Sequence, residues 1–378
     1  MEATTTDGTG TRRETAKADA AIDTIGTRER GDASRAGAPW CINEEVTSAL
    51  DAPDGQPQGP LSQRVKAKRS SLVKGLIKTI RPHQWVKNVF VLAPMFFDKD
   101  LVSQATNGDP SLNLRVTGMA LLGAAVFCLL AGAVYTINDL VDVEADRIHP
   151  VKRNRPIANG TVPESFAWPF TIALVILALG ISVWRLNYAF AAVAALYFAE
   201  NIAYSFKLKK VAFLDVGLIA FGFVLRVYAG GLATGTKVSW YMLACTALLA
   251  LFLGFGKRRH ELEGEHAGKQ RAALEAYSKG SLTAALAITG LATAATYIAY
   301  TLDRTTQSFF QTTWLWLTAP FVVFGIARFL MLVSGHAGRG LKSESPTQEM
   351  LSDVPFVLNI VAWCIVVVAI VYRLRPGT

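Results

Sequence analysis

Long apolar runs alternate with short polar loops along most of the chain, from about residue 85 to residue 372. Most of these runs reach the ~20 residues that a helix needs to cross a bilayer. The first run is shorter and contains Lys87 and Pro94, so we expect this lysine to face a cavity or to snorkel to the interface. The pattern predicts an all-α polytopic membrane protein with nine transmembrane helices, at Trp85–Phe97, Leu114–Ile137, Phe166–Trp184, Tyr188–Phe206, Phe213–Ala233, Val238–Phe255, Leu282–Thr301, Trp314–Val333 and Val354–Tyr372.

The composition agrees with a membrane protein. Hydrophobic residues make up 51% of the 378 residues, charged residues make up 18%, and the mean hydropathy is +0.31. The net charge of +9 is compatible with nucleic-acid binding, but the basic residues cluster beside the apolar runs. There they set topology, attract anionic lipid and bind anionic substrates, so we expect a membrane and no nucleic acid as partner.

The N-terminal part differs from the rest of the chain. Residues 1–63 are rich in Thr, Ala, Gly, Asp and Pro and show no apolar periodicity, which predicts a disordered tail. Residues 64–80 form a basic juxtamembrane segment. The spacing of Leu72, Leu76 and Ile80 is compatible with an amphipathic helix on the membrane surface, and the lysines and arginines are equally compatible with a solvated flank. The transmembrane domain is expected at residues 81–375.

Loop charges orient the predicted spans. Clusters of Lys and Arg occupy alternate loops, at residues 147–155, 207–210, 257–279 and 339–342, while the opposite loops carry single cations such as Arg185, Lys237 and Arg304. The positive-inside rule places the clustered loops and the N-terminus in the cytoplasm and the C-terminus outside. Cys41, Cys128, Cys245 and Cys364 show no metal or redox spacing, so we expect neither a disulfide nor a zinc site.

An acidic motif follows the second predicted span. Asn138, Asp142 and Asp146 are spaced i, i+4, i+8 and would share one helical face, with Asp139 at its border. Carboxylates in one row repel each other unless a cation neutralises them, and all-oxygen ligands suit Mg²⁺, which often also holds substrate phosphates. Beyond the motif lie cations that are able to bind such phosphates, namely Lys152, Arg153 and Arg155. The alternative is a solvated helix end without function.

These residues resemble a known family. The string from Asn138 to Ala158, N-D-x-x-D-V-E-A-D-R-x-H-P-x-K-R-x-R-P-I-A, resembles the first aspartate-rich motif of the UbiA superfamily of intramembrane prenyltransferases. It is similar in particular to the decaprenyl-phosphate phosphoribosyltransferase branch, as are the segment Arg81–Asn88 and the segment Tyr204–Lys209 with Asp215. The resemblance covers roughly residues 75–375 and implies a UbiA-like helical bundle in the cell (inner) membrane, with a cytoplasm-facing active site.

The resemblance also implies a reaction. A pentosyltransferase of this branch moves 5-phosphoribose from phosphoribosyl diphosphate (PRPP) to a polyprenyl (decaprenyl) phosphate and releases diphosphate, which supplies cell-wall arabinan precursors. Mg²⁺ bound by Asn138, Asp142 and Asp146 would neutralise the leaving diphosphate, and these three residues are the expected catalytic group. Lys87 would steer the lipid phosphate, and the Tyr135 hydroxyl would reach the same pocket.

A second group of candidate substrate-binding residues lies around the fifth predicted span, namely Tyr204, Lys209, Asp215 and Arg226. Only Asp215 stands where this superfamily commonly carries a D-x-x-x-D-like motif, which weakens the case for a second metal. Arg226 is a candidate ligand-binding residue because of its depth in the span, and a structural pair with Glu200 is the alternative. Lys257, Arg258 and Glu261 fall in a predicted cytoplasmic loop that is either a lid or a simple topology signal.

Two other functions are compatible with the same residues. A prenyltransferase that acts on an aromatic acceptor would use the aspartates to bind prenyl diphosphate. The single Asp215 and the Arg81–Asn88 segment argue against it. A transporter with buried charges is the other alternative, but transport sites tend toward the bilayer midplane, whereas these carboxylates lie at one end of a span. The polyprenyl length and the oligomeric state do not follow from the sequence.

Overall fold

The computed structural model describes residues 71–97, 102–104, 110–206, 208–263, 274, 276–334, 350 and 352–373. The expected disordered tail, residues 1–63, and residues 64–70 of the basic segment lie outside these ranges. Residues 71–79 are helical. The remaining elements, in which η denotes a 3-10 or π segment, are η1 (Pro82–Leu92), α2 (Ala93–Phe96), β1 (Val102–Gln104), β2 (Pro110–Leu112), α3 (Leu114–Val141), α4 (Val143–Ile148), η3 (Lys152–Asn154), α5 (Glu164–Ile181), η4 (Ser182–Leu186), α6 (Tyr188–Phe206), η5 (Leu208–Lys210), α7 (Leu214–Thr234), α8 (Trp240–Glu263), α10 (Lys279–Leu302), α11 (Arg304–Phe310), η7 (Trp314–Thr318), α12 (Ala319–Val333), α14 (Val354–Val368) and η8 (Ala369–Arg373).

The all-helical membrane architecture expected from the sequence is confirmed. Eight stretches of the described residues are long and apolar enough to cross a membrane, and they correspond to eight of the nine predicted spans. These stretches are Leu114–Val141, Glu164–Leu186, Tyr188–Phe206, Leu214–Thr234, Trp240–Leu262, Lys279–Leu302, Trp314–Val333 and Val354–Val371. Among the described residues, the only strands are β1 and β2, which pair antiparallel with Val102 opposite Leu112.

The count of nine spans is not confirmed, because the first predicted span falls in the 3-10 helix η1 and the four-residue helix α2, which together are too short to count as a membrane-spanning helix. Arg81 has a positive φ of 52°, which ends the helix of residues 71–79. Pro82 then begins η1, and the short helix α2 follows it. This segment packs along α3 and α7, and its Val91 is fully buried. Pro82 lacks a backbone N–H donor, which favours the break at Arg81.

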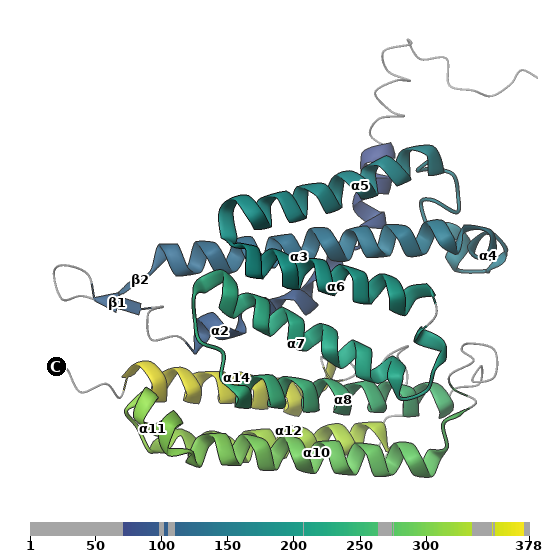
Figure 1. Cartoon of the computed structure of the whole chain (residues 1–378). Helices are drawn as coiled ribbons and strands as arrows, with labels where there is room; N and C mark the ends of the chain where they lie inside the picture. The colour runs from purple at the N-terminus through teal and green to yellow at the C-terminus, as the bar shows by residue number, and fades with distance from the viewer. Residues whose placement is uncertain are drawn as a thin grey trace, which may run out of the picture. The chain divides into compact units, whose positions relative to one another are not determined.

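Two apolar cores hold the helices together. The first includes Val91, Phe127, Phe190, Tyr197 and Leu225 and joins η1, α3, α6 and α7. The second includes Val216, Phe252, Leu286, Phe329 and Phe356 and joins α7, α8, α10, α12 and α14. Helix α7 contributes to both cores, and Figure 1 shows it between the helices α3, α5 and α6 on one side and α8, α10, α12 and α14 on the other.

The helix directions define two ends of the bundle. The N-terminal half of α3 lies against the end of α7, where a Cβ on Gly123 would lie 3.3 Å from Cβ of Ala233. The end of α3 and the start of α7 therefore share the opposite end, which we call the motif end. Helix α8 ends and α10 begins there as well, because Asp215, Arg258 and Tyr277 contact one another. Helix α10 consequently ends, and α11 begins, at what we call the far end (Figure 1).

The helix of residues 71–79 covers the loop after the acidic motif. Leu72 and Leu76 pack on a buried cluster that contains Leu140, Val143 and Val162. Ile80 packs against α3, where a Cβ on Gly132 would lie 3.1 Å from Cβ of Ile80. The apolar side chains of Leu72, Leu76 and Ile80 therefore pack on protein, and the prediction that this helix lies on the membrane surface stays a prediction.

Candidate functional site

The acidic motif lies at a bend between two helices. Helix α3 ends at Val141, and Asp142 follows with φ −91° and ψ 7°, outside regular helical geometry. The backbone N–H of Asp142 still donates to the Asn138 carbonyl over 3.0 Å, and that of Asp146 donates to the Asp142 carbonyl over 2.8 Å. Asp146 therefore belongs to the short helix α4, and the single continuous helix expected for the motif is interrupted at Asp142.

The bend divides the side chains of the motif into two groups: two carboxylates that pair with an arginine, and two side chains without a partner among the described residues. Asp139 and Asp146 are each 2% exposed and share one cation, since Nη1 of Arg155 lies 3.2 Å from Oδ1 of Asp139 and 2.5 Å from Oδ2 of Asp146. Asn138 and Asp142 are half-buried, and neither side chain has a hydrogen bond or ion pair within the described part of the chain. The expected row of three ligands is thus split, with Asp146 turned to Arg155.

Arg81 completes the neutralisation of Asp139. Its guanidinium forms an ion pair with the Asp139 carboxylate and lies 5.1 Å from the centre of the Tyr135 ring. Sequence reasoning included Arg81 in the segment that resembles the family but assigned it no role. Its position directly before Pro82, where a helix is expected to stop, was the available signal.

The first described segment also brings Lys87 and Asn88 to the site. Lys87 is exposed on η1, between the exposed Val86 and Val89. It lies close enough to Arg81, Arg226 and Lys257 to be repelled by all three charges. Positive charges from α7, α8 and the start of the domain therefore act on Lys87, and a region of positive potential attracts phosphate groups.

Arg226 is held by the protein itself. It is 8% exposed and donates to Oδ1 of Asn88 over 2.9 Å, to the Tyr197 hydroxyl over 2.7 Å and to the Gly222 carbonyl over 3.0 Å. Among the described residues, Arg226 and Glu200 do not form the ion pair that was the alternative. Oε2 of Glu200 instead accepts a hydrogen bond from Asn201 over 2.8 Å. Neither Asn88 nor Tyr197 was identified from the sequence, because their partner Arg226 is distant along the chain.

Asp215 is enclosed by protein groups. It is fully buried, its Oδ2 lies 3.2 Å from Nε of Arg258, and its Oδ1 accepts a 2.7 Å hydrogen bond from the Tyr277 hydroxyl. Burial and the hydrogen bond to Asp215 raise the pKa of Tyr277, so this hydroxyl remains a donor. The Tyr277 oxygen in turn accepts the Phe213 N–H over 2.6 Å. Asp215 therefore joins α7 to α8 and to the segment before α10.

The remaining predicted residues vary in exposure. Lys257, Arg258 and Glu261 are on α8, which continues to Glu263, so the expectation that they form a loop was wrong. Arg258 is 1% exposed and also pairs with Glu261. Tyr204 and Lys209 are half-buried, Lys152 and Arg153 are exposed on η3, and the side chains of these four make no hydrogen bond or ion pair with a described residue.

Two oxygen donors of the motif, from Asn138 and Asp142, suit a Mg²⁺ ion that also binds a phosphate substrate. Among the described residues, no group of three or more His, Cys, Asp or Glu side chains is arranged to hold a metal. Asn138 and Asp142 nevertheless offer an amide and a carboxylate oxygen that no group of the described residues occupies. Mg²⁺ is commonly held by one or two carboxylates together with water and substrate phosphates. The donor set therefore suits an ion completed by a phosphate substrate.

Comparison with known proteins agrees with this architecture. Residues 101–339 match the UbiA prenyltransferase family. The decaprenyl-phosphate phosphoribosyltransferase of Corynebacterium glutamicum is 34% identical over 307 residues, covering 80% of this chain and 88% of that protein. The enzyme of the same name from Mycolicibacterium smegmatis is 35% identical over 311 residues, covering 80% and 94%.

A solved structure shares the fold. A UbiA homolog from Archaeoglobus fulgidus bound to DMAPP and Mg²⁺ superposes with a TM-score of 0.58 at 18% identity, covering 79% of this chain and 99% of that one. The sequence match, the helical architecture and the acidic motif at the end of α3 all point to the same family. The chain belongs to the UbiA prenyltransferase family and is a multi-pass membrane transferase similar to the decaprenyl-phosphate phosphoribosyltransferases of that family.

Proposed function

We propose that the protein transfers 5-phosphoribose from PRPP to a polyprenyl (decaprenyl) phosphate in a Mg²⁺-dependent reaction that releases diphosphate. The motif end faces the cytoplasm of the cell in this proposal, because the clusters of Lys and Arg gather in the loops at that end. The names of the two relatives support the choice of lipid phosphate as acceptor. The product would serve as a precursor for cell-wall arabinan.

The division of the acidic motif supports this proposal most strongly. Asp139 and Asp146 hold Arg155, and Asp139 also holds Arg81, so these two carboxylates keep two cations at the motif end. Asn138 and Asp142 remain available to an ion that enters with a phosphate substrate. A site with free oxygen donors beside fixed cations suits a diphosphate that arrives with Mg²⁺. Asp146 then acts through Arg155 and not as a third ligand.

The leaving group determines what the protein must stabilise. The bond between the ribose anomeric carbon and the diphosphate oxygen breaks, and the diphosphate leaves with the bonding electrons. Mg²⁺ held by Asn138 and Asp142 would neutralise part of that charge. Arg155, with the exposed Lys152 and Arg153, is placed to bind the remaining phosphate oxygens by charge-assisted hydrogen bonds.

The lipid phosphate is proposed to enter beside η1. Lys87 stands between Val86, which is 68% exposed, and Val89, which is 52% exposed, so a cation and an apolar surface occur together. A polyprenyl phosphate needs this combination for its headgroup and its chain. Its ionised oxygen attacks the anomeric carbon directly, and no general base is required. Tyr135, beneath Arg81, contributes its hydroxyl to the same region.

The other predicted binding residues take different roles in this proposal. Tyr204 and Lys209 are without side-chain partners among the described residues and are proposed to contact substrate. Asp215 and Arg226 are buried and bonded to protein groups, so we assign them to positioning. Arg226 fixes Asn88, the neighbour of Lys87, and thereby fixes the orientation of η1.

One assay tests the reaction. Purified protein in detergent receives ribose-labelled PRPP and polyprenyl phosphate, with Mg²⁺ or with a chelator, and the label is measured in the lipid fraction. The proposal requires Mg²⁺-dependent appearance of labelled lipid with release of one diphosphate per transfer. A parallel reaction contains labelled prenyl diphosphate and an aromatic acceptor. Product formed only in that parallel reaction would replace the proposal with aromatic prenylation.

A further inference from the structure

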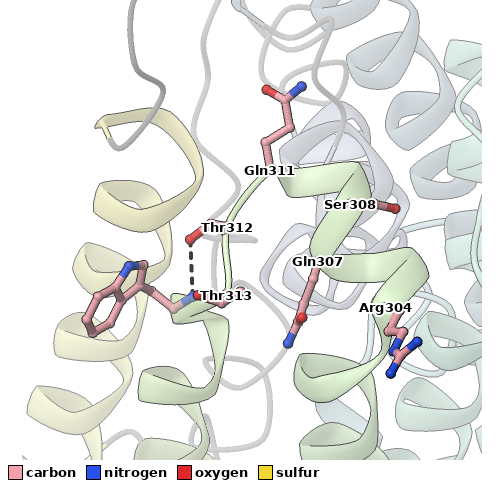
Figure 2. A pocket seen from close by; sticks show the side chains of 7 residues that line it. Arg304, Gln307, Ser308, Gln311, Thr312 and Thr313 are labelled. Carbon is pink, nitrogen blue, oxygen red and sulfur yellow. Dashed lines mark hydrogen bonds between the residues drawn. The ribbon is translucent and has the colours of Figure 1, made fainter.

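A cavity lies at the far end of the bundle, away from the acidic motif. Its volume is about 670 Å³, and its lining includes Arg304, Gln307, Ser308, Gln311, Thr312 and Trp314 (Figure 2). The lining carries one cation, several neutral hydrogen-bonding groups and no carboxylate. These residues belong to α11, to the link between α11 and η7, and, for Trp314, to the start of η7.

The cavity lies where a bilayer surface is expected. Helix α10 ends at Leu302, and the next candidate span begins at Trp314, so residues 303–313 connect two spans. Large aromatic side chains are exposed at this end, with Trp314 54%, Trp316 48% and Trp240 64% exposed. Tryptophans concentrate at membrane interfaces, where their rings lie at the level of the lipid headgroups. The cavity therefore opens at the headgroup level of the leaflet opposite the motif end.

Arg304 brings an uncompensated positive charge to this cavity. Its side chain makes no ion pair or hydrogen bond with any described residue. The neighbouring Asp303 lies outside the lining and forms no ion pair with Arg304; its Oδ2 accepts from the Thr306 N–H over 2.9 Å and caps α11. The guanidinium is thus free to bind an anion with paired N–H donors.

The backbone of the cavity is held in place before any ligand binds. Thr312 Oγ1 accepts the Trp314 N–H over 3.1 Å, and the Thr312 N–H donates to the Gln307 carbonyl over 3.2 Å (Figure 2). Beneath it, Phe310 and Leu315 are buried against Ile370 near the end of the chain. Because the backbone is already fixed, a ligand has only the side chains of the lining to order.

We propose that this cavity binds the headgroup of an anionic phospholipid of the phosphatidylglycerol type. Arg304 binds the phosphodiester, the amide and hydroxyl side chains bind the glycerol hydroxyls, and Trp314 lies along the start of the acyl chains. A choline headgroup fits less well, since its trimethylammonium has no hydroxyl for the amide and hydroxyl side chains of the lining to bind. The site is separate from the proposed transfer reaction and does not depend on it.

Native mass spectrometry of the full-length protein in detergent tests this assignment. The protein is titrated with dioleoylphosphatidylglycerol, with dioleoylphosphatidylcholine and with glycerol 1-phosphate, and the affinity for the first bound molecule is measured. Arg304→Gln is compared with Arg304→Lys and with Arg185→Gln. Arg185 is a matched control, because it is also a cation at the far end, with its guanidinium 5.2 Å from the Trp184 ring and outside the cavity lining.

The assignment requires that Arg304→Gln weakens phosphatidylglycerol binding about tenfold or more, equivalent to about 1.4 kcal/mol. Arg304→Lys should weaken it less, and Arg185→Gln should leave it unchanged. Each variant should elute and catalyse like the parent protein, since neither position belongs to the proposed site. Equal losses in Arg304→Gln and Arg185→Gln, or equal affinity for phosphatidylcholine, would mean that the lipid is merely annular and would overturn the assignment. Glycerol 1-phosphate binding as tightly as the lipid would overturn the lipid as occupant.

Discussion

Arg258 and Asp215 form an ion pair in the interior of the bundle, with 3.2 Å between Nε and Oδ2 and with exposed side-chain fractions of 1% and 0%. The pair joins the last turns of α8 to the first turn of α7. Each charge has a second partner, since Asp215 accepts from Tyr277 and Arg258 contacts Glu261. A buried pair of this kind is sensitive to removal of one member, because the other charge stays buried.

Asp215→Asn should therefore destabilise the protein by about 3 kcal/mol. This value is near the lower end of the range for a broken buried pair, because Glu261 still neutralises Arg258 in the variant. Unfolding in detergent, followed by circular dichroism, measures the change. Glu144→Gln removes the same charge from the exposed Glu144–Arg147 pair and should change stability by less than about 1 kcal/mol. Equal stability of the two variants would show that Asp215 contributes no such link.

Asp142→Asn should abolish turnover while leaving the fold intact. The Asp142 side chain has no partner among the described residues, so the substitution breaks no protein contact and removes only charge from the proposed ion site. The Mg²⁺-dependent transfer rate, measured at matched expression, checks this. Glu144→Gln lies near it on α4 and should keep its activity. Near-normal Mg²⁺-dependent activity of Asp142→Asn would count decisively against the proposed ion site.

Lys87→Met should raise the Michaelis constant for polyprenyl phosphate, or lower turnover, by one to two orders of magnitude. This size follows from the loss of a charge-assisted hydrogen bond worth about 1.5–3 kcal/mol. The constant for PRPP should change much less, since that substrate is assigned to the acidic motif and Arg155. Lys237→Met, an exposed lysine between α7 and α8 at the far end, is the control. Unchanged lipid kinetics in Lys87→Met would remove Lys87 as the headgroup site.

Gly230→Ala should disrupt the packing of η1 on α7. A Cβ at this position would lie 2.0 Å from the carbonyl oxygen of the fully buried Val91, and backbone at that depth has no room to move. We expect a loss of about 3 kcal/mol or more in unfolding free energy. Gly217→Ala on the same helix meets no atom within 4 Å and should be neutral or should stabilise by about 0.5–1 kcal/mol. If Gly230→Ala were as stable as Gly217→Ala or more stable, η1 would not pack on α7 as described.

Much of the membrane architecture was predictable from local sequence. Eight of the predicted spans correspond to helices, because an apolar run of that length has to satisfy its backbone hydrogen bonds internally in lipid. The first predicted span is not among them, because the chain there forms the 3-10 helix η1 and the short helix α2, which pack on α3 and α7. Local hydropathy contains no information about that packing.

The identity of the acidic motif also followed from the sequence alone, since its residue types and spacing are contiguous in the chain. The sequence did not show that Asp139 and Asp146 hold arginines while Asn138 and Asp142 have no partner among the described residues. Arg81 and Arg155 are 58 and 16 positions from Asp139 along the chain and reach it only after the chain has folded. The same reason explains Arg258, Tyr277 and Asn88, which were missed or assigned to other roles. Periodicity along one helix specifies which side chains share a face, whereas the partners on that face come from other helices, and only the packing of the bundle decides which charges remain open to a substrate.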